Sequence, residues 1–506
     1  MTINVVFISF IFYGAFFYKM CYSIKQKETT LIANKLGILK ELKTIENKKV
    51  KIKRETFSSG IAVFFATLSS AVGLGNIWKF PSMVGTNGGG AFILVYLISV
   101  LLVSLPVMIS EFYIGRSSRS NTVGAFDKLR APKFFRIVGY LGVISTSLIL
   151  FFYSAVAGWV YSYLFRAIRG DFKKLSSIPM DQATEEIVAI FNTTVAGKIS
   201  PMIWQLIPIL FVTIVIIAGV KKGIEKVTKT SMPILFTLII VTCVLALRLE
   251  GASQGINFLL RVDLKAITPG MILAALGLAF FKLSIGVGTM ITYGSYITDD
   301  NNMIGNAFKV MLSDTLVSVT VGLAIFPAVF TFGLEPTEGP ALLFNTIPLV
   351  FSRIPFGNLL VIIFFLLTSL AATMSMLSLV EVPVAFLSEE FNVNRKTAVI
   401  SIMTIAAIVG VLTVHPGSFF GNVQLLGLSF FDLFDYISSN ILMPVTGLLI
   451  VIFVGYFTSK SALVKELSNN YSLKNNLPIK IFYLLTKYVA PLLILIVFLN
   501  SLGLLG

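Results

Sequence analysis

AVGLGNIWKFP, residues 71–81, interrupts an apolar segment that is otherwise long enough to cross a membrane, and NGGGA follows at 87–91. Glycine and proline release backbone amides and carbonyls from the helical hydrogen-bond ladder. Hydrocarbon offers these groups no partner, so irregular backbone at membrane depth is tolerated only beside a cavity lined by protein or water. The stretch therefore predicts a polar binding site inside a membrane protein.

The composition describes a helical membrane protein. The chain has 506 residues, of which 56% are hydrophobic, and its mean hydropathy is +0.89. Its net charge of +16 does not predict nucleic-acid binding, because the basic residues gather in short loops between apolar runs. Cys21 and Cys243 cannot form a disulfide framework, and a single histidine gives no Cys/His cluster. We therefore expect no enzyme, no catalytic metal and no cofactor apart from a possible sodium ion.

Apolar runs recur along the whole chain, and each is long enough to span a bilayer. We predict eleven core spans, at 57–83, 89–115, 137–167, 201–220, 230–249, 268–296, 304–332, 357–387, 396–413, 428–457 and 478–503. Residues 335–356 are too short to span, which predicts a surface or re-entrant helical segment. Residues 169–200 are polar and predict an outer loop.

Basic loops set the predicted orientation. Lysine and arginine are concentrated at 116–136, 221–229 and 460–480, whereas the alternate loops are mixed or acidic. The positive-inside rule then places the start of the first core span in the cytoplasm of a multi-pass protein. Residues 1–55 form an extension: Thr2–Tyr18 is apolar, and eleven lysines and arginines follow between Lys19 and Arg54. We predict an extra N-terminal membrane helix and a basic cytoplasmic segment; a mis-assigned start or a weak surface helix is the alternative.

A second break, LSIGVG at 283–288, lies in the sixth core span, where its position matches that of the first break in span one. Spans one to five (about 56–250) and six to ten (about 266–460) then form two halves, each opening with a broken helix. This arrangement is typical of transporters built from inverted repeats. The span at 478–503 follows the second half.

Several motifs together resemble the neurotransmitter:sodium symporter family, and in particular its bacterial amino-acid transporters. They are Arg54-Glu-Thr-Phe, AVGLGNIWKFP, NGGGAF, Glu111-Phe-Tyr-Ile-Gly-Arg116, Tyr153, FFKLSIGVG at 280–288, ITYGSY at 291–296 and DLFDY at 432–436. The resemblance runs from about Lys53 to the C-terminus, and we predict one transporter domain at 56–506. It implies an all-α polytopic fold, the LeuT-like 5+5 inverted repeat with broken helices in core spans one and six.

The resemblance also implies where an amino acid binds. Its carboxylate would meet backbone amides of the first break, Ala71 to Gly75 with Gly73 between them, and the hydroxyl of Tyr153. The implied pocket residues are Ile149, Phe281, Ser284, Val287, Ser375 and Ser378. These mostly apolar walls favour an aliphatic or aromatic amino acid.

Two charge pairs match gates of the family. Lys79 and Asp435 match the outer pair, and Arg54 and Glu389 match the inner pair. Partly exposed ion pairs are weak enough to open and close. Glu111 matches a buried glutamate that we expect to be structural.

The sequence departs from the family at its first sodium site. That site would use the Ala71 carbonyl and the Asn76 side chain, but Lys282 and Asp314 stand where the family has threonine and asparagine. Inserting a lone lysine at the middle of the membrane costs roughly 2.5–3.5 kcal/mol of free energy. We therefore predict that the Lys282 ammonium occupies the first sodium position and pairs with Asp314.

The second sodium site and the chloride site are also altered. The second site would combine the Val72 and Ala371 carbonyls with Ser375, but Met374 supplies a thioether where a hydroxyl is usual. Thr373 is the nearest substitute. Leu278 replaces the glutamine that accompanies chloride, so we expect no chloride despite Ser318.

These features predict a secondary active transporter of an amino acid in the plasma membrane of a prokaryote. Its partners are the amino acid and the lipid bilayer, with no nucleic acid. The coupling ion stays open between sodium and protons, and uncoupled carriage or exchange is a further alternative. A non-transporting sensor with the same fold is the other candidate. The sequence leaves the oligomeric state open.

Overall fold

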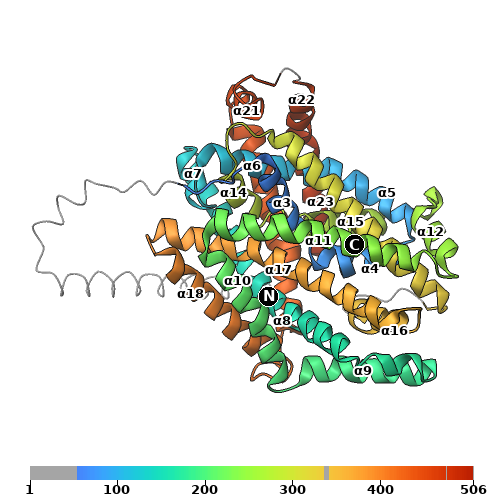
Figure 1. Cartoon of the computed structure of the whole chain (residues 1–506). Coiled ribbons are helices and arrows are strands. Elements are labelled where there is room, and N and C mark those ends of the chain that lie inside the picture. The colour runs from blue at the N-terminus through green and yellow to red at the C-terminus, as the bar shows by residue number, and fades with distance from the viewer. Residues whose placement is uncertain (1–53, 335–340, 474–475, 505–506) are drawn as a thin grey trace, which may run out of the picture.

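The computed structural model describes residues 54–334, 341–473 and 476–504 and forms a bundle of long helices (Figure 1). The predicted N-terminal helix and nearly all of the extension lie outside these residues. Within them, nine helices are long and apolar enough to cross a membrane. The bent pair Gly60–Ala71 and Gly75–Thr86 counts as a tenth span. The remaining predicted span, 268–296, contains the shorter apolar helix Pro269–Lys282 and a second break.

The unbroken spans are built from α-helices, several of which continue into a short π-helical or 3₁₀ turn. They are α5–η2–α6 (Gly90–Ser99, Val100–Ser104, Leu105–Ser118), η3–α8 (Lys133–Phe135, Arg136–Arg169), α10 (Ser200–Ile217), η5–α11 (Val220–Glu225, Lys226–Ala246), α15 (Met303–Thr331), α17 (Gly357–Glu390), α18–η8 (Arg395–Val409, Gly410–Val414), α19–η9–α20–η10 (Phe430–Asp435, Tyr436–Leu442, Met443–Ile452, Phe453–Phe457) and α22–η11–α23 (Leu477–Leu484, Leu485–Val489, Ala490–Ser501).

The first broken span follows the glycine-rich stretch. Helix α3 (Gly60–Ala71) ends where Val72 turns extended, and the chain resumes as η1 (Gly75–Lys79) and α4 (Phe80–Thr86). The two parts are bent by 57°. The NGGGA motif is not part of this break. It forms the turn between α4 and α5, where Gly88 and Gly89 adopt positive φ.

The second broken span consists of α13 (Pro269–Lys282) and α14 (Thr289–Gly294), separated by the six residues 283–288. Gly286 and Gly288 have φ of +74° and +80°, a region that side chains with a Cβ rarely adopt. A Cβ on Gly286 would also lie 2.5 Å from the carbonyl oxygen of Met443. The glycines are therefore required both by the backbone conformation and by close packing against α20.

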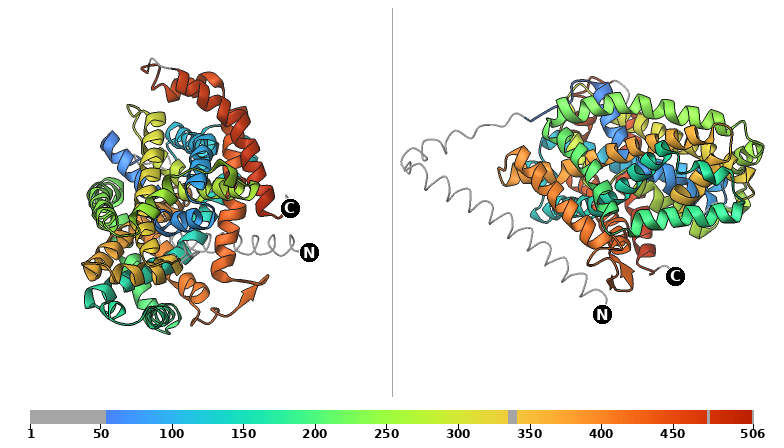
Figure 2. Two further views of the ribbon diagram at one scale, coloured as in Figure 1. Left: turned by 90° about the vertical axis from the view of Figure 1, so that its right-hand side faces the viewer. Right: turned by 60° about the horizontal axis from the view of Figure 1, so that its bottom comes forward.

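Helices α8 and α17, each of 34 residues, pack against one another at the centre of the bundle. Helix α17 is buried almost throughout its second half, and α3, α10, α11 and α18 surround it. Figure 2 shows the same helices from two further directions. Both breaks lie beside this central pair, because α3 of the first broken span and α14 of the second both contact α17.

Two segments differ from the prediction. Residues 169–200 are not merely a loop: they contain η4 (Lys173–Ser176) and the amphipathic helix α9 (Met180–Ala196), whose Ala183, Ile187 and Ile190 are buried. The described part of 335–356 is helical, as expected, in η7 (Leu342–Thr346) and α16 (Ile347–Ser352). However, it is buried against α17 and α9 instead of lying on the surface. Its apolar side chains find this cover because α9 folds over them.

The remaining elements are short and lie in the connections. They are α7 (Gly124–Lys128), α12 (Ala252–Leu260), η6 (Leu264–Ala266), α21 (Lys460–Leu467) and the strands β1 (Gln424–Leu425) and β2 (Leu428–Ser429). The strands form an antiparallel pair between η8 and α19, with Leu425 opposite Leu428. Helix α12 packs on α15 at one end of the bundle, whereas α21 packs on α6 at the other end.

Candidate substrate and ion site

A cavity of about 50 Å³ lies where the two broken spans meet α8 and α17. Nine of the ten predicted substrate residues line it: Ala71, Gly73, Gly75, Ile149, Tyr153, Phe281, Ser284, Val287 and Ser375. The predicted tenth, Ser378, does not. Its hydroxyl faces α3, where it accepts a hydrogen bond from the Ser70 hydroxyl at 2.9 Å, and it donates to the Ser375 carbonyl. Leu379 and Met443 also line the cavity, and the sequence analysis did not predict them.

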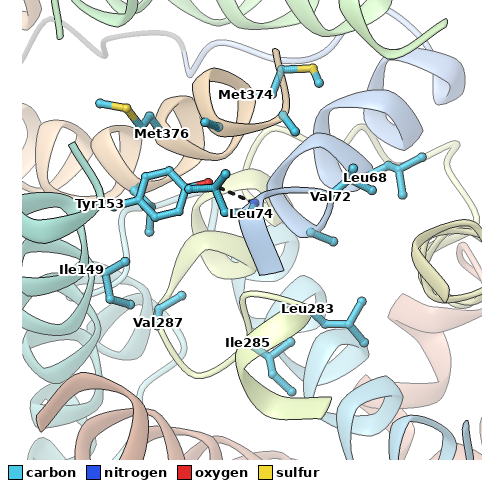
Figure 3. Packing of buried hydrophobic residues seen from close by; sticks show 14 of the residues in the cluster. Leu68, Val72, Leu74, Ile149, Tyr153, Leu283, Ile285, Val287, Met374 and Met376 are labelled. Carbon is cyan, nitrogen blue, oxygen red and sulfur yellow. Dashed lines mark hydrogen bonds between the residues drawn. The ribbon is translucent and has the colours of Figure 1, made fainter. Parts of the chain in front are cut away.

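The polar end of the cavity is built from the first break and Tyr153. The Leu74 amide points at the Tyr153 hydroxyl at 3.4 Å (Figure 3). A Cβ on Gly73 would come within 3.1 Å of the same hydroxyl and would collide with Ser375. Glycine at this position therefore lets the backbone of the break approach both side chains. A backbone amide at the start of a helical segment, beside a phenol, is a suitable environment for a carboxylate.

The opposite walls are apolar. Ile149 and Val287 lie next to the Tyr153 ring (Figure 3). Phe281 closes the cavity on the side of the larger outer space described below. These side chains offer no charge to an incoming side chain, so the cavity suits an apolar group.

Beside this cavity lies a buried ion pair. Lys282 Nζ is 2.8 Å from Asp314 Oδ2, and both side chains are fully buried. The ammonium also donates a hydrogen bond to the Ser318 hydroxyl. It lies 4.7 Å and 4.9 Å from the centroids of the Phe80 and Tyr96 rings, whose faces favour a cation. The predicted pairing of Lys282 with Asp314 is thus present.

Asn76 belongs to the same cluster, but not in the predicted way. Its amide nitrogen donates to Asp314 Oδ1 at 2.7 Å and to the Ser318 hydroxyl at 2.9 Å. Its oxygen, expected to face an ion together with the Ala71 carbonyl, accepts from the Gly73 amide at 3.1 Å. The carboxylate of Asp314 turns the amide this way, because only the NH₂ group can donate to it.

The second predicted ion position is closed by a direct contact. The Ser375 hydroxyl donates to the Val72 carbonyl at 3.3 Å, and Ala371 and Met374 are buried near it on α17. Thr373 is not a substitute ligand here. Its hydroxyl donates to the Ser369 carbonyl at 2.7 Å and lies 2.8 Å from the Tyr161 hydroxyl, which belongs to α8.

The predicted pair of Arg54 and Glu389 is formed at the end of the bundle where the described residues begin. Arg54 contacts Glu389 in an ion pair, donates to the Ser295 hydroxyl, and lies 4.8 Å from the centre of the Tyr296 ring.

Next to this pair is a second one that the sequence did not predict. Arg395 holds Glu381 through two hydrogen bonds of 2.7 and 3.0 Å, and the Tyr296 hydroxyl donates to Glu381 at 2.6 Å. Tyr296 therefore links the two ion pairs, and this end of the pathway is closed.

At the opposite end, the predicted pair of Lys79 and Asp435 is not formed among the described residues. The Lys79 ammonium lies 3.6 Å above the centroid of the Phe281 ring, and Asp435 accepts a hydrogen bond from Ser439 at 2.7 Å. A space of about 380 Å³, lined by Lys79, Phe281 and Ser439, lies here. The separation of the two charges coincides with this space, so no ion pair closes this end.

Glu111 supports the second break from α6. Its carboxylate accepts a hydrogen bond from the Gly286 amide at 2.6 Å, and the residue is fully buried. The contact satisfies a backbone donor that the break frees, which agrees with the structural role expected for this residue.

The sequence and the fold of the chain are similar to those of known proteins. The profile of the sodium:neurotransmitter symporter family matches residues 54–176 and 184–505. The chain is 38% identical to the uncharacterized sodium-dependent transporter YhdH of Bacillus subtilis, over 89% of this chain and 98% of that protein. It is 35% identical to an uncharacterized sodium-dependent transporter of Haemophilus influenzae, over 91% and 100%. The crystal structure of MhsT in complex with L-phenylalanine superposes with a TM-score of 0.80 at 39% identity, covering 89% of this chain and 100% of that one.

Proposed function

Because the chain belongs to the sodium:neurotransmitter symporter family, we propose that it is a secondary active transporter that carries an apolar amino acid by alternating access. The observation that carries this proposal is the cavity at the junction of the two breaks, with the Leu74 amide and the Tyr153 hydroxyl at one end and apolar walls at the other. The complex of MhsT with L-phenylalanine supports an amino acid of this kind.

The closed Arg54 end and the open Lys79 end support a pathway that opens on one side at a time. Basic loops at the Arg54 end support its assignment to the cytoplasm of a prokaryotic cell. In this orientation the structure corresponds to an outward-facing state. Substrate would enter past Lys79 and Phe281 and leave after the Arg54–Glu389 pair separates.

For the first ion position, we propose that the Lys282 ammonium replaces a sodium ion. Two opposite charges 2.8 Å apart attract by about 6 kcal/mol at an effective dielectric constant near 20. This offsets the roughly 2.5–3.5 kcal/mol that each of the two charges costs at mid-membrane. The Ser318 hydroxyl donates its hydrogen to the Asp314 carbonyl at 3.0 Å and accepts from the Lys282 ammonium. Because no hydrogen is left for an anion, we propose that transport does not require chloride.

For the second position, we propose that one sodium ion binds between the Val72 and Ala371 carbonyls and the Ser375 hydroxyl. The hydroxyl would have to rotate, because in this structure it donates to the Val72 carbonyl and so directs its hydrogen, not its lone pairs, toward the site. Sodium is a hard cation that prefers oxygen ligands, and the buried thioether of Met374 would not contribute.

Uptake by the full-length protein in liposomes tests these proposals. Radiolabelled aliphatic and aromatic amino acids are supplied with a sodium gradient, a proton gradient, or neither. Uptake that requires sodium supports the second ion position. Uptake driven only by protons would place the coupling at the Lys282–Asp314 pair instead. Exchange without either gradient indicates an uncoupled carrier, and binding without any uptake would refute transport and favour a sensor.

A further inference from the structure

A wide apolar groove lies on the outside of the bundle, away from the substrate cavity. Its volume is about 810 Å³, and it is formed by η2 and α6, the first turns of α15, and α21, α22 and η11. Leucine, isoleucine, phenylalanine and proline make up most of its lining. Phe308 and Ile481, on opposite walls, are 46% and 51% exposed. The groove is thus open to the surroundings of the bundle at the depth of the spans.

Polar contacts at one end of the groove hold its walls apart. Arg116, at the end of α6, pairs with Glu466 of α21 at 2.5 Å and donates to the Asn301 carbonyl at 2.8 Å. Asn469 accepts from Arg116 and donates to the Asp300 carbonyl. These contacts anchor α21 on α6 and on the segment that precedes α15. Figure 1 shows α21 and α22 side by side at the top of the bundle. The groove is therefore set by the fold of this end.

Two exposed lysines adjoin lining residues of the groove. Lys309 on α15 and Lys480 on α22 are exposed and flank lining residues, Phe308 and Ile479. At a rise of 1.5 Å per residue, Lys309 lies about 9 Å along α15 from the first residue of that helix. Lys480 lies about 5 Å along α22 from its first residue. Among the nearby acids, Glu466 is paired with Arg116 and Asp299 with Arg119, which leaves Asp300 as the exposed carboxylate.

We propose that this groove binds one anionic phospholipid. An acyl chain fills the apolar groove, and the phosphate lies between Lys309 and Lys480. The groove is at the Arg54 end of the bundle, which the proposed orientation places in the cytoplasmic leaflet. Anionic lipids are attracted there by basic residues, and basic pockets between membrane helices bind such head groups. The lysines sit within two turns of the helix ends, where long side chains reach the head-group region.

Native mass spectrometry of the full-length protein in detergent tests the proposal. The protein is titrated with phosphatidylglycerol or with phosphatidylcholine of identical acyl chains. We expect one retained phosphatidylglycerol, preferred by roughly 25-fold, because each lysine near an anionic group contributes roughly five-fold. Replacing both lysines, Lys309→Gln and Lys480→Gln, should reduce the affinity to that for phosphatidylcholine. Lys396→Gln, an exposed lysine of α18 away from the groove, is the matched control and should change nothing.

A second variant tests the groove itself. Leu105→Trp fills the lining and should abolish retention of both lipids, whereas Leu316→Trp, on the exposed face of α15, should not. Equal retention of both lipids that is insensitive to the lysine variants and to Leu105→Trp would overturn the proposal and indicate unspecific boundary lipid. A dimer peak that Leu105→Trp removes, or retention that requires deletion of residues 1–53, would also overturn it, because the groove would then be covered by a second copy or by the chain itself.

Discussion

Replacing Lys282 and Asp314 separately and together tests whether they act as one unit. Asp314→Asn leaves a buried ammonium without a counter-charge, and Lys282→Thr leaves a buried carboxylate. Their attraction is about 6 kcal/mol at 2.8 Å and an effective dielectric constant near 20. Removing one partner of a buried pair costs about 3–5 kcal/mol. We expect each single substitution to lower the free energy of unfolding by that amount.

The double substitution should behave differently, because it buries no unpaired charge. It loses hydrogen bonds and some packing, which costs about 1–2 kcal/mol. The coupling energy between the two sites should then exceed about 3 kcal/mol, whereas exposed pairs such as Lys174 and Glu186 give below about 1 kcal/mol. That exposed pair, replaced in the same way, is the control.

The double substitution also recreates the side chains that the family uses at its first sodium position. Sodium should therefore stabilise this variant beyond its effect on the unaltered protein, by about 2.7 kcal/mol at a concentration 100 times the dissociation constant. The assay is unfolding in detergent, in sodium and in potassium chloride at equal ionic strength. Costs of the single substitutions that add up within about 0.5 kcal/mol, with no added response to sodium, would refute the reasoning.

Three further outcomes are expected. Tyr153→Phe should weaken amino-acid binding by roughly 5- to 30-fold without changing the melting temperature, since a hydroxyl contact contributes about 1–2 kcal/mol; an unchanged dissociation constant would contradict the site. Glu389→Gln should speed hydrogen exchange near Arg54 by roughly 2- to 5-fold, because the part-exposed pair contributes below about 1 kcal/mol; unchanged exchange would show that the pair does not hold this end closed. Gly286→Ala should lower the yield of folded protein sharply. The control is Gly277→Ala, which should be neutral or slightly stabilising because its added Cβ meets nothing within 4 Å. Equal yields of the two variants would contradict the argument that an alanine at position 286 is strained.

The two breaks could be predicted from sequence because glycine has a direct physical signature. Positive φ at Gly286 and Gly288 and the extended Val72 are states that an apolar span does not otherwise adopt. The pairing of Lys282 and Asp314 followed from a similar argument, since a buried charge requires a partner. Nine of the ten substrate residues that the family resemblance implied line the cavity.

The side-chain orientations that the sequence did not predict depend on contacts between helices. The Asn76 oxygen accepts from the Gly73 amide because its NH₂ group donates to the Asp314 carboxylate. The sequence around either residue does not indicate this orientation of the amide. Ser378 hydrogen-bonds to Ser70 and to the Ser375 carbonyl and does not line the cavity. Lys79 lies on an aromatic ring, not on a carboxylate, because its position depends on how far the outer end is open.

If the Lys282 ammonium replaces one sodium ion, as we propose, the energetics of substrate accumulation change. A sodium ion travels with the substrate, but a positive charge bonded to the protein does not leave it. Each mobile charge that crosses a potential of 100 mV contributes about 2.3 kcal/mol, which corresponds to roughly a fifty-fold concentration ratio. With one travelling cation fewer, the steepest gradient that the carrier sustains is lower by that factor. In return, the gradient responds less to changes in membrane voltage, and each imported molecule dissipates less of the ion gradient.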